Sequence, residues 1–88
     1  MKTGGVFLDV YANVKKSVGE EHTIIVVSTK VSKKAVVRNK IRRQIKEILR
    51  LPLINSRFAV NRVVVKSNIV GHSFDEIKKD IEQALYSL

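Results

Sequence analysis

The chain has 88 residues, which is enough for one small domain over residues 1–88. Hydrophobic residues make up 44% of it, which indicates a packed core, and the lack of cysteine excludes disulfides and thiolate metal sites. Seventeen lysine and arginine residues against eight acidic ones leave a net charge of +9, which is typical of a protein that binds a polyanion. The apolar runs are too short to span a membrane and the start does not read as a signal peptide, so we expect a cytoplasmic protein.

The first predicted element is a strand over residues 6–12, where apolar side chains alternate along the chain. One face would carry Val6, Leu8, Val10 and Ala12, and the other would carry Phe7, Asp9 and Tyr11. A second strand is predicted over residues 23–28, because its β-branched centre is typical of a strand buried on both faces. We expect the two strands to pair as a hairpin.

A helix is predicted over residues 35–51, ended by Pro52, because the residue before a proline disfavours the α conformation. At about 100° per residue its apolar side chains share one arc, which would pack on a sheet. That arc consists of Val37, Ile41, Ile45, Ile48 and Leu49. The opposite arc, called the basic ridge below, would face solvent. The ridge consists of Asn39, Arg42, Arg43, Lys46 and Arg50.

The last elements are a buried strand over residues 61–66, around three consecutive valines, and a closing amphipathic helix over residues 74–88. Ser73 and Glu76 have the spacing of a capping box, which predicts where this helix begins. The order of elements favours an α+β fold: a two-layer sandwich in which the basic helix and the C-terminal helix cover a small mixed sheet.

No catalytic constellation is visible in the sequence. His22 and His72 have no second ligand at metal spacing, so we interpret them as surface residues. Ser28 and Thr29 have no adjacent base, and Asp75 and Glu76 are explained by helix capping. We therefore predict no catalytic residue, no metal site and no cofactor bound by the protein.

The basic segment carries the functional signal. Eight of the seventeen residues in 30–46 are lysine or arginine and none is acidic. A solvated helix face usually alternates charge sign, because each like-charge i,i+4 pair costs roughly 0.2–0.5 kcal/mol. We therefore favour nucleic-acid binding over a merely solvated face. The candidate RNA-binding residues are Lys30, Lys33, Lys34, Arg38, Asn39, Lys40, Arg42, Arg43, Lys46 and Arg50.

Residues 29–47 resemble the signature of the bacterial ribonuclease P protein subunit. That family has a Ser-Lys-Lys start followed by Ala-Val-x-Arg-Asn-Arg/Lys-x-Lys/Arg-Arg-x-x-Arg/Lys on a helix. The matching positions are Arg38, Asn39, Lys40, Arg42, Arg43 and Lys46. The buried strand, the capping box and the closing helix follow in the family's order, so the resemblance covers most of the chain.

The sequence departs from the family pattern at three places. Val31 stands where the family usually has the second lysine, and Lys33 stands where it often has glycine. Family members usually open with a basic helix that carries Phe-x-x-Val-Phe/Tyr, which residues 7–11 echo. Too few residues separate Tyr11 from Ile24 to hold another strand and its turn, so we place residues 6–12 on the first strand and expect the opening helix to be missing.

The resemblance implies a protein that assists a catalytic RNA in removing the 5′ leader of precursor tRNA, and thus a subunit of an endoribonuclease. It implies that the RNA hydrolyses the bond with bound Mg²⁺, that the basic helix contacts this RNA, and that a cleft between helix and sheet receives the leader. It also implies a left-handed crossover between parallel strands, which is rare in proteins. Phe7 and Tyr11 are candidate leader-binding residues by base stacking, although packing under a helix explains them equally well.

Two other interpretations remain from the sequence. A ribosomal or other structured-RNA-binding protein would have a similar basic composition, but it does not need the Arg38-Asn39 pair with its fixed spacing to later bases. A module that binds anionic membranes is disfavoured, because the apolar arc lacks Trp and Phe and is needed to cover the sheet. No membrane partner and no particular oligomeric state are predicted.

Overall fold

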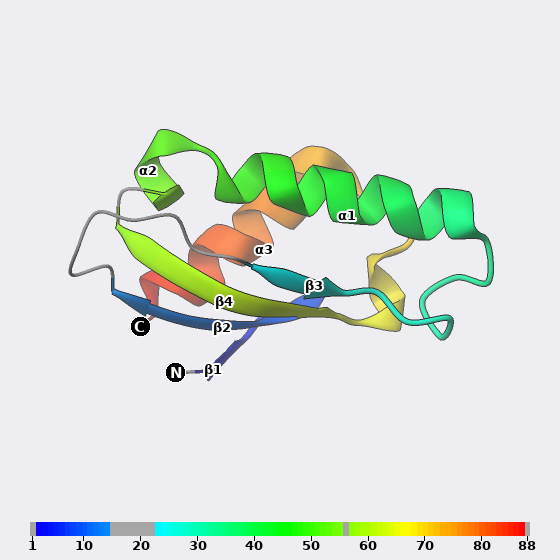
Figure 1. Ribbon diagram of the computed structural model, residues 1–88, viewed down its shortest axis with the longest axis horizontal. Helices are drawn as coiled ribbons and strands as arrows, with labels where there is room; N and C mark the ends of the chain where they lie inside the picture. The colour runs from blue at the N-terminus through cyan, green and yellow to red at the C-terminus, as the bar shows by residue number, and fades with distance from the viewer. Residues whose placement is uncertain (1, 15–22, 56, 88) are drawn as a thin grey trace.

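Four strands and two long helices form two layers in the computed structural model, which describes residues 2–14, 23–55 and 57–87 (Figure 1). The strands are β1 (Lys2–Gly4), β2 (Leu8–Val14), β3 (Ile24–Val26) and β4 (Phe58–Val65). The helices are α1 (Ala35–Leu49), the short α2 (Pro52–Asn55), the 3-10 helix η1 (Ser67–Ile69) and α3 (Phe74–Tyr86).

The sheet has the strand order β1-β2-β4-β3. β4 runs antiparallel to β2 on one side and parallel to β3 on the other, with Ile25 opposite Val63. The predicted hairpin between residues 6–12 and 23–28 is therefore wrong, because β4 lies between these two strands. β1 was not predicted, since a run of three residues is too short to show an alternating pattern.

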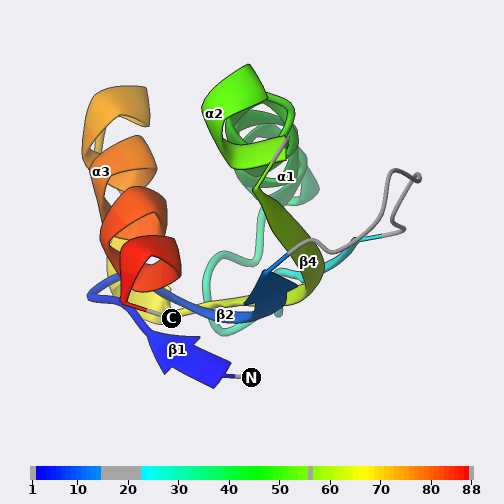
Figure 2. The ribbon, with the colours of Figure 1, turned by 90° about the vertical axis from the view of Figure 1, so that its left-hand side faces the viewer.

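The chain passes from β3 to the parallel strand β4 through α1. Both α1 and α3 lie on the same face of the sheet, and no described helix covers the opposite face (Figures 1 and 2). Followed from β3 through α1 to β4, the connection is left-handed. The predicted α+β sandwich with a mixed sheet is thus confirmed.

The hydrophobic core lies between the two helices and the sheet. Its members include Leu8, Val10 and Ala12 of β2, Val60, Val63 and Val65 of β4, Ile41, Ile45 and Ile48 of α1, and Ile77, Ile81 and Leu85 of α3. Burying apolar surface of this kind stabilises a fold by roughly 25 cal/mol per Å². The apolar arc of α1 therefore packs on the sheet as predicted, with Val37 and Leu49 half-buried at its margins.

Two predictions about buried strand faces are wrong. Val6 is 61% exposed, because it precedes β2 and lies in the turn that joins β1 to β2. Ile24 is 59% exposed and Val26 is also exposed, so β3 is not buried on both faces. β3 is an edge strand, and its outward side chains lie on the sheet face that no described helix covers.

The end of α1 and the start of β4 differ from their predicted boundaries. α1 ends at Leu49, and Pro52 begins α2, where a proline at the first helical position loses no hydrogen bond. β4 begins at Phe58 and not at residue 61. A register shift at Tyr11 and Ala12 leaves Asn61 without an opposite residue on β2, which interrupts the alternation that would have revealed the first half of β4.

The predicted capping box at the start of α3 is confirmed. The Ser73 hydroxyl accepts a hydrogen bond from the Glu76 amide, and the Glu76 carboxylate accepts one from the Ser73 amide. Glu76 also lies 2.7 Å from Nδ1 of His72. The hydrogen bond with His72, followed by those with Ser73, holds the pKa of the Glu76 carboxyl below its usual value. The ionised Glu76 therefore stabilises the fold at pH values above the usual carboxyl pKa. This stabilisation is lost as the pH falls through the lowered pKa.

A buried carboxylate on α3 fixes the turn between β1 and β2. Asp80 is 5% exposed, and its two oxygens accept the backbone amides of Val6 and Phe7 at 2.7 and 2.9 Å. A Cβ atom at Gly5 would lie 2.6 Å from Oδ2 of Asp80 and 2.7 Å from the Leu8 carbonyl, so the turn requires glycine there. Asp80 thus joins the edge of the sheet to the helix layer.

We predict that Asp80→Ala lowers the free energy of unfolding by about 2–3 kcal/mol, because two backbone amides lose a charged acceptor. Asp75→Ala is the matched control, since Asp75 is an exposed acid in the first turn of the same helix and should cost less than about 1 kcal/mol. Urea denaturation of the three proteins measures both values. Equal losses would show that Asp80 acts through its charge on the helix and not through the turn.

Candidate nucleic-acid interface

The basic ridge lies on α1, on the side that faces away from the sheet. Asn39, Arg43, Lys46 and Arg50 are exposed, whereas Arg42 is half-buried. Arg42 was predicted to lie on the solvent side of the helix, and its guanidinium reaches back along the helix and donates to Oδ1 of Asn39 at 2.7 Å. This bond orients both side chains at the centre of the ridge.

Arg38 makes a contact within the protein that the sequence did not predict. Its guanidinium donates to the carbonyl of Ser32 at 2.8 Å, and its side chain is half-buried beside the apolar arc. The sequence indicated a residue free to contact phosphate at the start of the helix. The structure shows that Arg38 also holds the preceding loop against α1.

The loop before α1 adds three exposed cations to the ridge. These are Lys30, Lys33 and Lys34. Lys34 is the N-cap residue of α1, and its side chain makes no capping hydrogen bond; the first turn of α1 contains no acidic residue. The positive end of the helix dipole therefore lies next to exposed lysines, which favours an anion at this end of the helix.

The face of the sheet opposite the helices carries a second group of candidate residues. The strand register places one row of side chains across all four strands, called the Tyr11 row below: Lys2, Tyr11, Arg62 and Ile24. Nζ of Lys2 lies 5.9 Å from the centre of the Tyr11 ring, and the Arg62 guanidinium lies 5.6 Å from it. A row of cations around an aromatic ring suits a single-stranded nucleic acid, because bases stack on the ring and cations bind phosphates.

Phe7 and Tyr11 do not share a surface, although the sequence predicted that they would. Phe7 precedes β2, is partly buried against the core, and its ring lies 4.1 Å from the His72 ring. Tyr11 lies within β2 on the open face of the sheet. The packing explanation therefore suits Phe7, whereas Tyr11 remains available for stacking.

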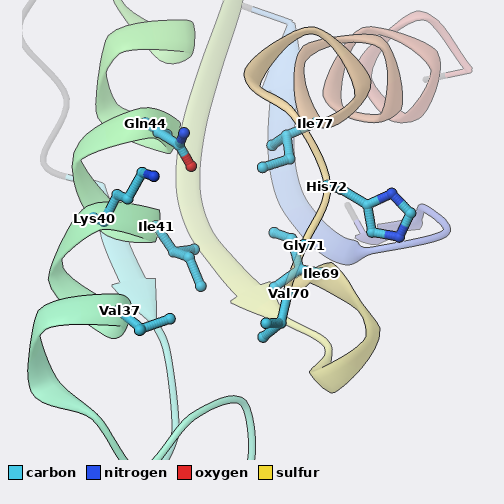
Figure 3. A pocket seen from close by; sticks show the side chains of 9 residues that line it. All are labelled: Val37, Lys40, Ile41, Gln44, Ile69, Val70, Gly71, His72 and Ile77. Atoms are coloured by element: carbon cyan, nitrogen blue, oxygen red, sulfur yellow. The ribbon is translucent and has the colours of Figure 1, made fainter.

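A hollow of about 260 Å³ lies between α1 and the segment from η1 to α3. Figure 3 shows Val37, Lys40 and Ile41 on the α1 side, facing Ile69 and Val70 across the hollow. Lys40 thus lies on the flank of α1 that faces α3, apart from the ridge. Ile41, Ile45 and Ile48 on the buried side of α1 belong to the hydrophobic core between the helix and the sheet.

Sequence reasoning missed Lys2 and Arg62 as candidate binding residues. Arg62 had a usable signal, because it alternates with the buried Val63 within the predicted strand and so had to point outward. Lys2 had no such signal, since its strand was too short to predict.

In the described part of the chain, no three His, Asp or Glu side chains come together in a way that would hold a metal ion. Nor does that part contain a helix with the length and apolar character needed to cross a membrane.

These features define a small α+β domain with a left-handed crossover and a one-sided basic helix. The family described as Ribonuclease P matches residues 3–88 of the chain. The fold is similar to that of a solved Staphylococcus aureus structure, described as an RNase P protein mutant with defective mRNA degradation activity, with a TM-score of 0.77. The two chains are 24% identical, and the likeness covers 98% of this chain and 72% of that one. No curated protein matches the sequence significantly.

The family match extends over nearly the whole chain, and the fold agrees with it. The chain therefore belongs to the ribonuclease P protein family. Membership of this family connects the chain with tRNA processing and with an RNA partner in a ribonucleoprotein.

We predict that Arg38→Ala lowers the free energy of unfolding by about 1–2 kcal/mol, because the Ser32 carbonyl loses its charged donor and the half-buried stem loses its packing. Arg43→Ala is the control: Arg43 is exposed on the same helix, and its loss should change stability by less than about 0.5 kcal/mol. Chemical denaturation measures both variants. If Arg38→Ala proves as stable as Arg43→Ala, the bond to Ser32 does not stabilise the fold.

Proposed function

We propose that this chain is the protein subunit of ribonuclease P, and that it binds the catalytic RNA through α1 and the loop before it. In this role it assists removal of the 5′ leader from precursor tRNA in the cytoplasm. The RNA, with its Mg²⁺, carries out the hydrolysis as an endonuclease. The protein contributes binding and positioning, in keeping with the lack of a recognisable nucleophile and base in its sequence.

The observation that carries the proposal is the unpaired charge of α1. The ion pairs within 4 Å among the described residues are Lys2–Asp9, Lys66–Asp9, His72–Glu76 and Lys78–Glu82. None of them involves a cation of α1 or of the preceding loop. Like charges one turn apart repel each other, and phosphate groups that bind between them offset this repulsion. Asn39, held by Arg42, adds a directional polar group to the same surface.

The leader of the precursor is assigned to the open face of the sheet. Tyr11 is the aromatic residue of this face, and cations flank it on both neighbouring strands. An unpaired base that stacks on such a ring gains roughly 1–3 kcal/mol. Phe7 was an equal candidate from the sequence, but its stacking on His72 supports a packing role for it.

The first test of the proposal concerns the basic ridge. Arg42→Glu combined with Arg43→Glu should weaken binding to the catalytic RNA and flatten its dependence on salt by roughly 0.7–0.9 log units in slope for each phosphate that the protein no longer binds. The melting temperature should hold or rise, because repulsion between like charges is relieved. The measurement is RNA affinity across a salt series, together with stimulation of precursor-tRNA cleavage by the RNA.

The matched control is Lys78→Glu combined with Lys79→Glu, which makes the same change in net charge on α3. This variant should bind the catalytic RNA more tightly than the ridge variant does. Protein without the catalytic RNA should not cleave the precursor. Equal affinities of a folded ridge variant and the wild type would exclude the ridge as the RNA-binding surface, and a wild type that binds many structured RNAs equally would favour a general RNA-binding protein.

The second test concerns the leader. Tyr11→Ala should weaken binding of precursor tRNA to the holoenzyme by roughly five- to a hundredfold, the equivalent of removing one stacked base, while binding of mature tRNA stays unchanged. Tyr86→Ala is the control, because Tyr86 is an exposed tyrosine on α3, on the other side of the sheet. If Tyr11→Ala weakens precursor and mature tRNA alike, the open face does not contact the leader.

A further inference from the structure

A second row of side chains crosses the open face of the sheet beside the Tyr11 row. It is called the Asp9 row here, and the strand register assigns to it Gly4, Asp9, Val64 and Val26. The two rows differ in charge. The Tyr11 row contains two cations and no acid, whereas the Asp9 row contains one acid and no cation.

Asp9 lies between two lysines that come from different parts of the chain. Its Oδ2 is 3.9 Å from Nζ of Lys2, and its Oδ1 is 3.5 Å from Nζ of Lys66. The Asp9 side chain is 22% exposed, and a Cβ atom at Gly4 would lie 3.4 Å from Oδ1. The Asp9 carboxylate therefore packs close to the backbone of Gly4, the residue opposite it on β1.

The ammonium groups of the two lysines differ in their contacts with oxygen acceptors. Lys66 also donates to the carbonyl of Gly5 at 2.7 Å, so its ammonium group already has two acceptors. Lys2 has the longer contact to Asp9 and lies beside the Tyr11 ring as well. Arg62 forms no ion pair within 4 Å in the described part of the chain, so its charge is available to a ligand.

The consequence for a polyanion follows from the sign of these charges. A phosphate above the Tyr11 row approaches the guanidinium of Arg62, which has no ion pair within 4 Å among the described residues, and the base next to that phosphate stacks on the Tyr11 ring. A phosphate above the Asp9 row approaches a carboxylate, and it gains Lys66 only by breaking that lysine's ion pair with Asp9. The position above the Asp9 row is thus less favourable for a phosphate, although two lysines lie beside it.

We propose that Asp9 is a specificity-determining residue that confines single-stranded RNA to the Tyr11 row by occupying Lys66 and by placing a negative charge in the neighbouring row. This inference rests on the proposed contact between the open face and the leader. Arg62 and Tyr11 then bind the strand, and Asp9 lowers the affinity of the rest of the face for phosphate. The ligand class is an unpaired RNA segment without a required base sequence, since every base has a face that stacks.

The experiment is a double-mutant cycle with Asp9→Asn and Lys66→Ala. The probe is a labelled single-stranded RNA oligonucleotide of mixed sequence, bound by the protein without the catalytic RNA. Asp9→Asn should bind roughly three- to tenfold more tightly at low salt, with a salt dependence steeper by about 0.7 log units for each lysine released. Lys66→Ala should change little in the wild type but should remove much of the gain in the Asp9→Asn protein.

Three further variants make the cycle specific. Glu82→Gln removes an acid that pairs with Lys78 at 3.9 Å on α3, and it should leave oligonucleotide binding at the wild-type level. Asp9→Glu keeps the charge and should behave as the wild type. Arg62→Ala should weaken binding in both Asp9 backgrounds. Melting curves of all variants show whether each is folded, and Asp9→Ser, which also removes the carboxylate, replaces Asp9→Asn in the cycle if the latter is not.

The outcomes separate this inference from the proposed function. A cycle with no coupling between residues 9 and 66, or Asp9→Asn equal to Glu82→Gln, overturns the role of Asp9 even if the wild type stimulates the catalytic RNA. Failure of every variant to bind the oligonucleotide overturns it as well. A wild type that does not bind the catalytic RNA, together with a coupled cycle, overturns the proposed function and leaves the selectivity of the sheet face intact.

Discussion

The parallel pairing of β3 with β4 is the interaction on which the rest of the structure depends. Two parallel neighbours cannot be joined by a tight turn, so the chain must cross the sheet between them, and here it does so through α1. The apolar arc of α1 then packs on the sheet, and its opposite arc carries the basic ridge into solvent. Because α3 lies on the same side, the other face of the sheet has no described helix over it. The pairing of β3 with β4 thus determines the position of both the basic ridge and the open face of the sheet.

The two surfaces differ in whether their cations have acidic partners. On α1 the cations have no acidic partner among the described residues, and the repulsion between them is tolerated because Ile41, Ile45 and Ile48 anchor the helix in the core. On the sheet face one acid, Asp9, pairs with two lysines. Exposed ion pairs of this kind add little stability, about 0–1 kcal/mol. In the role proposed for Asp9, their larger effect is on where on the sheet face a phosphate binds.

Helices were predictable from the sequence and the sheet was not, for physical reasons. The buried faces of α1 and α3 follow from an apolar period near 3.6 residues, and the start of α3 follows from the Ser73–Glu76 capping box. Pro52 marked the end of α1 only to within a few residues, because it begins α2. Strand order depends on contacts between residues 24–26 and 62–64, which no local pattern encodes. The extra residue Asn61 also breaks the alternation in β4, so the start of that strand was missed. The ridge was recognisable because its cations lie in one helix, whereas the Tyr11 row draws its residues from four strands.

In the proposed function, the basic ridge and the open face of the sheet bind two different RNA segments. The ridge and the Tyr11 row lie on opposite sides of the sheet, so a segment bound to one does not block the other. Once α1 holds one RNA, a second segment tethered to it reaches the sheet face at a high effective concentration. Weak binding at the sheet face is then sufficient, and an acid that lowers its affinity becomes an advantage, because a bound strand must also leave after cleavage. A sheet face as uniformly basic as α1 would retain any single strand, including the released product.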